Sequence, residues 1–147
     1  MRFKVEHRDL FTVPSDYYLA HCISADFKLG AGIAKTFDVK YNMRNKLFQK
    51  SNNYEYHGGD ALPIENVFNL VTKPRYFDKP TYGLLRQALV EMRCLMEECN
   101  ITKLAIPQLG CGLDRLEWSR VEEIIKDVFA DTSVDILVCV CYETDKR

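Results

Sequence analysis

The sequence predicts an α/β sandwich built on a largely parallel sheet. Two observations predict it: short apolar runs typical of strands, and segments of helical periodicity that alternate with those runs along the chain. The third observation is size, because 147 residues, 47% of them apolar, are enough for one hydrophobic core. No repeat, low-complexity tract or Gly/Ser linker divides the sequence, so we expect a single domain over residues 1–147.

Five apolar runs are typical of strands. The first, Arg2–Glu6, alternates, with Phe3 and Val5 on one face, as an edge or half-buried strand does. The other four are more continuously apolar, as expected of strands that are buried on both faces. They are Leu19–Ile23, Val67–Val71, Lys103–Ile106 and Val134–Cys141.

Three segments between these runs have helical periodicity. The clearest has apolar residues three and four positions apart over about five turns, namely Tyr82, Leu85, Leu89, Met92, Met96 and Cys99. A second helix is predicted from Trp118 to Val128, and a third begins at Ile33 and reaches Tyr41. The segment Asn52–Pro63 is rich in Asn, Gly and Tyr, which predicts a loop with room for a short strand.

The charge and the cysteines exclude several classes of protein. Lys plus Arg is 20 and Asp plus Glu is 21, so the chain lacks the basic excess of a general nucleic-acid binder. No apolar run approaches the ~18 residues of a membrane span, and Met1–Lys4 does not resemble a secretory signal. The six cysteines include no Cys-x-x-Cys, and the three histidines form no ligand spacing with them, so we expect no metal site. We expect reduced thiols, most of them small core residues, in an intracellular protein of the nucleus or cytoplasm.

Polar residues and glycines follow three of the predicted strands at the point where each strand ends. Ser24 and the loop Gly30–Ile33 follow the second strand, Thr72 and Lys73 follow the third, and Pro107–Asp114 follow the fourth. Ligands of parallel sheets bind outside the carboxyl ends of the strands. We therefore expect these residues to converge on one site.

The two glycine segments of this edge are candidates for anion binding. Gly30-x-Gly32 opens a helix, whose backbone N–H groups are free to bind an anion. It is neither a dinucleotide fingerprint nor a Walker loop, because Lys35 and Ala34 replace the glycines that those motifs require. Taken alone it is either a helix-capping turn or a phosphate cradle. Together with Gly110-Cys111-Gly112 at the same edge, it suits a diphosphate.

Three charged residues each have a structural and a functional interpretation. Lys73 is either a solvated lysine or a nucleophile, and a nucleophile must first lose its proton. Asp114 either caps a helix as part of Asp-x-x-Glu with Glu117, or exchanges a proton with Lys73. Asp9 is either a turn residue or an acceptor for an exocyclic amine such as that of adenine.

Three other features have a mainly structural interpretation. His21 lies within a strand and is interpreted as a core histidine. Trp118 is interpreted as a core anchor at the start of a helix. The segment Pro74–Tyr82, rich in aromatic residues and proline, is either a packed loop or a lid over the site.

These motifs, in this order, resemble the macrodomain family, in particular its terminal ADP-ribose protein glycohydrolase type. The resemblance rests on six blocks: Asp9–Phe11, Ala20–Ser24, Gly30–Ala34, Thr72-Lys73, Lys79–Tyr82 and Gly110–Trp118. It implies a three-layer α/β/α sandwich with a mixed, largely parallel sheet. The chain departs from the family at Arg8, where glycine is usual, and Tyr142 is a candidate to stack at the adenosine end.

The resemblance also implies an activity. It implies removal of ADP-ribose from modified glutamate or aspartate side chains, with Lys73 attacking the distal ribose and Asp114 acting as acid and base, without a cofactor or metal. Asp9 and Leu10 would lie at the adenosine, Ser24 at the distal ribose, and the glycine segments at the diphosphate. The residues expected to contact ADP-ribose are Asp9, Leu10, Ser24, Gly30, Ala31, Gly32, Ile33, Thr72, Pro107, Gln108, Leu109, Gly110, Cys111, Gly112 and Leu113.

Two other functions suit the same pocket. One is an ADP-ribose 1″-phosphate phosphatase, for which Lys73 would be dispensable. The other is a non-catalytic reader of ADP-ribose, since glycine loops suffice for binding. In each case the expected partners are ADP-ribose and ADP-ribosylated proteins, not membranes or nucleic acids, and the expected state is a monomer.

Overall fold

A computed structural model describes residues 1–141, so Tyr142, the candidate for adenosine stacking, lies outside the described residues. The strands are β1 (Arg2–His7), β2 (Tyr18–Ser24), β3 (Ala61–Ile64), β4 (Val67–Lys73), β5 (Lys103–Ile106) and β6 (Asp135–Val140). The helices are α1 (Gly32–Tyr41), α2 (Met43–Ser51), α3 (Tyr82–Glu98) and α4 (Trp118–Phe129), with a short 3-10 helix, η1, at Leu10–Thr12.

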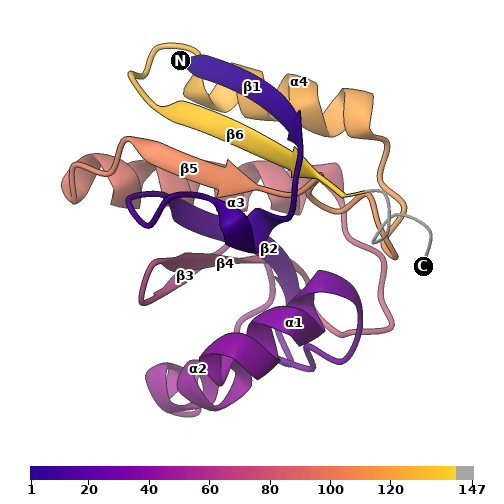
Figure 1. Cartoon of the computed structure of the whole chain (residues 1–147). Coiled ribbons are helices and arrows are strands. Elements are labelled where there is room, and N and C mark those ends of the chain that lie inside the picture. The colour runs from indigo at the N-terminus through magenta and orange to yellow at the C-terminus, as the bar shows by residue number, and fades with distance from the viewer. Residues whose placement is uncertain (142–147) are drawn as a thin grey trace.

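One mixed sheet forms the middle layer of the molecule (Figure 1). Its strand order is β1-β6-β5-β2-β4-β3, and every neighbouring pair is parallel except β3 with β4. The predicted α/β sandwich with a mixed, largely parallel sheet is therefore confirmed, and all five predicted strands are present. The antiparallel strand β3 begins within the predicted loop 52–63 and reaches β4 through a tight turn at Glu65 and Asn66.

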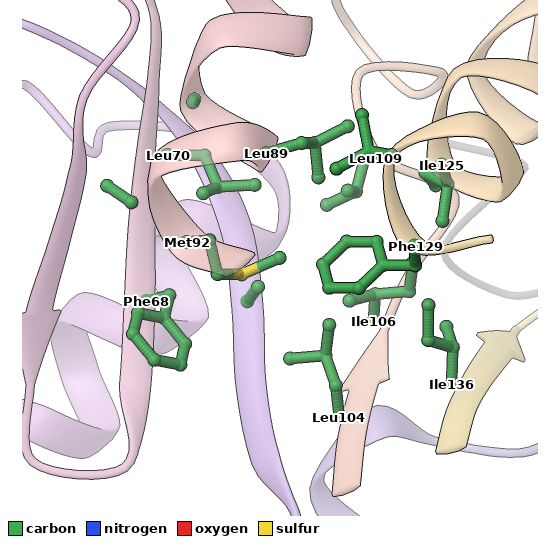
Figure 2. Close-up of a cluster of buried hydrophobic side chains, with 14 of the residues drawn as sticks. Phe68, Leu70, Leu89, Met92, Leu104, Ile106, Leu109, Ile125, Phe129 and Ile136 are labelled. Atoms are coloured by element: carbon green, nitrogen blue, oxygen red, sulfur yellow. The ribbon is translucent and has the colours of Figure 1, made fainter. Parts of the chain in front are cut away.

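The two faces of the sheet are covered by different helices, because successive strand residues point to opposite sides. On one face α3 and α4 pack against β2, β4, β5 and β6. Figure 2 shows this core, where Met92 of α3 and Phe129 of α4 lie next to Leu104 and Ile106 of β5. On the other face Phe37 of α1, together with side chains of α2, covers the alternate residues of β2 and β4.

Helix α2 is an element that the sequence analysis missed. Asn42 lies between α1 and α2 in the left-handed conformation, with φ +53°, and so separates two short helices. Met43 and Leu47 anchor α2 in the core, while most of its other residues are polar. A helix with so few apolar positions has weak periodicity in the sequence, and its formation depends on tertiary packing.

The six cysteines are all free, but the prediction that most of them lie in the core is wrong. Only Cys139 is buried, whereas Cys94 and Cys99 are exposed. The reason is the geometry of α3, where Met92 and Met96 occupy the face that packs on the sheet. Cys94 therefore faces solvent, and Cys99 lies just past the helix end.

Two features are absent from residues 1–141: a membrane-spanning helix and a metal-binding cluster. No helix in this part of the chain is long and apolar enough to cross a membrane. No group of three or more His, Cys, Asp or Glu residues among those described is arranged to hold a metal ion.

Candidate active site

The site begins where β2 and β4 end side by side. Ile23 pairs with Val71 but Ser24 pairs with Lys73, so Thr72 is an extra residue, a β-bulge, in β4. The bulge places Ser24 opposite Lys73, and the backbone N–H of Ala25 donates to the Lys73 carbonyl over 2.9 Å. Strand register therefore brings together two residues that lie 49 positions apart in the sequence.

Lys73 and Asp114 form an ion pair at the carboxyl ends of β4 and β5. Lys73 Nζ lies 2.6 Å from Asp114 Oδ1, and their side chains are only 13% and 23% exposed. The predicted convergence of these strand ends is thus present in the structure. In Figure 1 the β4–α3 and β5–α4 loops lie on the same side of the sheet, at the right of the view. A partly shielded ammonium–carboxylate pair is suited to proton exchange with a substrate.

The loop that carries Asp114 is closed by backbone hydrogen bonds. Cys111 N–H donates to the Gln108 carbonyl over 3.1 Å, and Leu116 N–H donates to the Gly110 carbonyl over 2.8 Å. Gly110 has φ +70°, and a Cβ there would meet Leu116 Cδ1 at 2.7 Å, so this position requires glycine. The helix-cap interpretation of Asp114 is excluded, because the N-cap of α4 is Glu117, which makes no side-chain cap bond.

The two glycine segments meet at the start of α1. Gly32 has φ +60°, and a Cβ there would come within 3.3 Å of Leu113 Cδ1, which is next to Asp114. Ala31, the N-cap of α1, provides no side-chain acceptor, so the first turn keeps free N–H groups. Gly30 and Gly112 have room for a Cβ, so the fold does not require glycine at either position. Open glycines beside a helix N-terminus suit a bound diphosphate.

Asp26 is a site residue that the sequence analysis missed. Its Oδ1 accepts hydrogen bonds from the Ser24 hydroxyl at 2.5 Å and from Lys28 N–H at 3.2 Å, and its Oδ2 accepts from Tyr76 N–H at 3.0 Å. Burial alone would raise the pKa of Asp26, but these hydrogen bonds outweigh burial and lower it. The ionised carboxylate thus orients Ser24 and ties the β2–α1 loop to the β4–α3 loop. The signal in the sequence was an aspartate just after a strand end, where it forms an Asx turn with the backbone N–H of Lys28, two residues further on.

Two half-buried thiols lie beside the ion pair. Burial, the negative charge of Asp114 and the nearby Cys111 raise the pKa of Cys22 to about 12. Burial raises the pKa of Cys111 to about 11. Both thiols are therefore protonated at neutral pH, which makes them poor nucleophiles and leaves Lys73 as the candidate. Thr72 is buried, and its hydroxyl has no hydrogen-bond partner among residues 1–141.

Asp9 lies away from the ion pair, at the start of η1. Its Oδ1 accepts from Phe11 N–H over 2.9 Å, so the turn interpretation of this residue is confirmed. Arg8 closes the same turn, because its Nη2 donates to the Thr12 carbonyl over 2.7 Å. Leu10 is buried in the α1-side core. The turn thus combines an exposed carboxylate at Asp9 with a buried side chain at Leu10.

The other predicted contact residues differ in what they can offer a ligand. Leu109 is 1% exposed and packs into the α3/α4 core, so only its backbone can reach a ligand. The exposed members of the set are Gly30, Ala31, Gly32, Gly112 and Leu113. The half-buried members are Ile33, Pro107, Gln108, Gly110 and Cys111.

Comparison with known proteins identifies the family of this chain. The Macro domain family matches residues 20–125, well over half of the chain. The chain belongs to the Macro domain family. This macrodomain is 38% identical to ADP-ribose glycohydrolase OARD1 of Bos taurus over 134 residues, which covers 88% of this chain and 86% of the bovine protein.

Solved structures show the same fold at lower identity. The macrodomain of Mycobacterium tuberculosis DarG superposes with a TM-score of 0.83 at 21% identity, over 93% of this chain and 96% of that one. Thermosipho africanus DarTG, solved in complex with ADP-ribose, gives 0.79 at 18% identity, over 97% of this chain and 42% of that one. The macrodomain fold implied by the sequence motifs is confirmed.

Proposed function

We propose that this macrodomain binds ADP-ribose and hydrolyses the ester that joins ADP-ribose to a glutamate or aspartate side chain of a protein. The observation that carries the proposal is the Lys73–Asp114 pair, 2.6 Å apart at the edge where the glycine segments meet. The bovine relative is named an ADP-ribose glycohydrolase and matches this chain over most of its length, which supports the same class of activity.

The proposed position of ADP-ribose follows the edge of the sheet. The diphosphate lies between the α1 N-terminus, where N–H groups are free, and Gly112, where nothing stands within 4 Å of a Cβ position. The distal ribose then reaches Ser24 and Lys73, and the adenosine extends toward the exposed carboxylate of Asp9. A carboxylate there accepts a hydrogen bond from the adenine amino group.

The proposed reaction uses both members of the ion pair. Asp114 takes a proton from the Lys73 ammonium, and the neutral Nζ attacks the anomeric carbon of the distal ribose. The Nζ–carbon bond forms while the carbon–oxygen bond breaks, and the substrate carboxylate leaves with the electron pair. Water then displaces the lysine: its hydroxyl goes to the anomeric carbon and its proton to Lys73. Asp114 releases its proton to solvent, which restores the ion pair.

The test is release of ADP-ribose from a protein that is mono-ADP-ribosylated on glutamate. We expect release by the wild type, and loss of release in both Lys73→Ala and Asp114→Ala. The matched control is Lys103→Ala, which also breaks a 2.7 Å lysine–aspartate ion pair, with Asp16, but at the amino end of β5. This control is expected to retain activity. Undiminished release by Lys73→Ala would contradict the lysine mechanism.

Two further measurements on the same variants separate the two other functions that suit this pocket. Release of inorganic phosphate from ADP-ribose 1″-phosphate, unchanged in Lys73→Ala, would indicate a phosphatase. Binding of free ADP-ribose without any turnover would indicate a reader. A mass increase on Lys73 in Asp114→Ala, equal to one ADP-ribosyl group, would support the covalent step.

A further inference from the structure

Exposed apolar side chains gather on the two loops that carry the Lys73–Asp114 pair. Tyr76 and Phe77 follow Lys73 by three and four positions and are 54% and 65% exposed. Leu113, next to Asp114, is 62% exposed. Exposing large apolar side chains to water is unfavourable, and such patches commonly mark binding surfaces.

Tyr76 and Phe77, here called the aromatic tip, occupy the end of a closed turn. Asp78 N–H donates to the Arg75 carbonyl, and Arg75 N–H donates to Asp78 Oδ2, each over 3.0 Å. The two rings meet edge to face with centroids 5.3 Å apart. These hydrogen bonds order the backbone of the turn, so it loses little further backbone entropy when a partner binds.

The turn is also held at a defined place relative to the site. Asp26 accepts the Tyr76 N–H and the Ser24 hydroxyl on its two oxygens, so one carboxylate connects the aromatic tip to the end of β2. Lys28 Nζ lies 5.3 Å from the Tyr76 ring centroid, and the Lys28 side chain passes close to Gly30. The aromatic tip thus continues the surface of the glycine segment.

The charges around the tip are complementary to an acidic partner. The side chains of Lys28, Arg75 and Lys79 are exposed there. The two acidic residues of the same surface, Asp26 and Asp78, already accept hydrogen bonds from backbone N–H groups of these loops. Three cations thus face two carboxylates on this surface, which leaves an excess of one positive charge beside the rings.

We infer that the aromatic tip docks the polypeptide segment that carries the modified side chain, and that this segment is acidic. The inference rests on the proposed function, because it places the protein part of the substrate beside the Lys73–Asp114 pair. ADP-ribose occupies the glycine segments, and the polypeptide attached to its distal ribose leaves the site between Lys73 and the aromatic tip. Apolar contact with the rings and attraction by the three cations hold it there.

The test compares two substrates that share the ADP-ribosyl ester and differ in what is attached. One is an acidic peptide that carries ADP-ribose on glutamate, and the other is an ADP-ribose ester of acetate. In the double variant Tyr76→Ser/Phe77→Ser we expect kcat/KM for the peptide to fall about tenfold, mainly through KM. The small ester is expected to be hydrolysed at the wild-type rate. Tyr54→Ser is the matched control, since Tyr54 is another exposed aromatic residue, 65% exposed, on the loop after α2.

Each other result has a distinct meaning. An equal loss on both substrates would overturn the inference, because the rings would then contact ADP-ribose itself, as a lid does. Unchanged kinetics on both substrates would also overturn it. Failure of the wild type to hydrolyse either ester would instead refute the proposed function. In that case binding measurements would test the docking inference. It predicts that the double variant binds the modified peptide more weakly than the wild type does, and binds free ADP-ribose equally well.

Discussion

His21 makes the stability of this fold sensitive to mild acid. The residue is fully buried under α1, where its ring stacks on Phe37 with centroids 4.0 Å apart. Its Nε2 lies 2.6 Å from Asn69 Oδ1, while the Asn69 amide nitrogen donates to the Leu62 carbonyl. The Asn69 oxygen is therefore the acceptor and His21 Nε2 carries the proton. Nδ1 has no partner in the described part of the chain, so a second proton there would be buried without a hydrogen bond.

The size of the effect follows from the pKa. Burial lowers the pKa of His21 from 6.5 to about 4, and the hydrogen bond with Asn69 offsets this only in part. The unfolded chain takes up a proton near pH 6.5 and the folded chain only near pH 4. The stabilisation by the neutral ring is thus complete above pH 6.5 and is lost as the pH falls from there toward 4. Between pH 7 and 4.5 the loss is about 2.4 kcal/mol.

The assay is urea unfolding at pH 7, 6, 5 and 4.5, followed by the fluorescence of Trp118, the single tryptophan, which packs partly buried at the start of α4. His21→Gln keeps a donor for Asn69 but cannot be protonated. Its free energy of unfolding should therefore fall less than that of the wild type, by about 2 kcal/mol over this range. His57→Gln, at an exposed histidine, is the control and should follow the wild type. Equal pH dependence of the wild type and His21→Gln would refute the reasoning.

Four further predictions concern the site. Gly110→Ala should destabilise the protein by about 1–3 kcal/mol in urea unfolding, because φ is +70° and the new Cβ meets a leucine side chain at 2.7 Å. Gly112→Ala, where nothing lies within 4 Å, should unfold like the wild type but bind ADP-ribose more weakly by calorimetry; unchanged affinity would contradict the diphosphate position. Asp26→Asn should lose about 1–2 kcal/mol of stability and slow hydrolysis of the small ester as well as the peptide, since it orients both Ser24 and the aromatic tip. Cys22, with its pKa raised to about 12, should react with iodoacetamide at pH 8 at least about tenfold more slowly than exposed Cys94, as measured by peptide mass spectrometry; similar rates would contradict a protonated Cys22.

Much of the fold could be predicted because its signals are local. The strand Lys103–Ile106 has the predicted bounds, and helix α3 begins at the predicted Tyr82. Continuous apolar runs and a strong 3.6-residue periodicity are properties of residues close together in the chain, so they can be recognised without knowledge of the tertiary structure. Helix α2 was missed because Met43 and Leu47 alone produce little helical periodicity. The helix is stabilised by the packing of these two side chains in the core.

The candidate site divides in the same way. The sequence predicts that Lys73, Asp114 and the glycines lie at strand ends. It also predicts that they share one site, because parallel strands bring their carboxyl ends to one edge. The sequence by itself also determined the family, through motifs that occur in a fixed order.

Only the tertiary structure decided how those residues interact. It assigned Asp114 to Lys73 and not to the cap of α4, and it placed Asp26 between Ser24 and the aromatic tip. It also separated Gly110, which the backbone requires, from Gly112, which it does not. The physical reason is that hydrogen bonds, ion pairs and close contacts depend on distances between segments far apart in the chain. Those distances are set by strand register and by the packing of helices on the sheet.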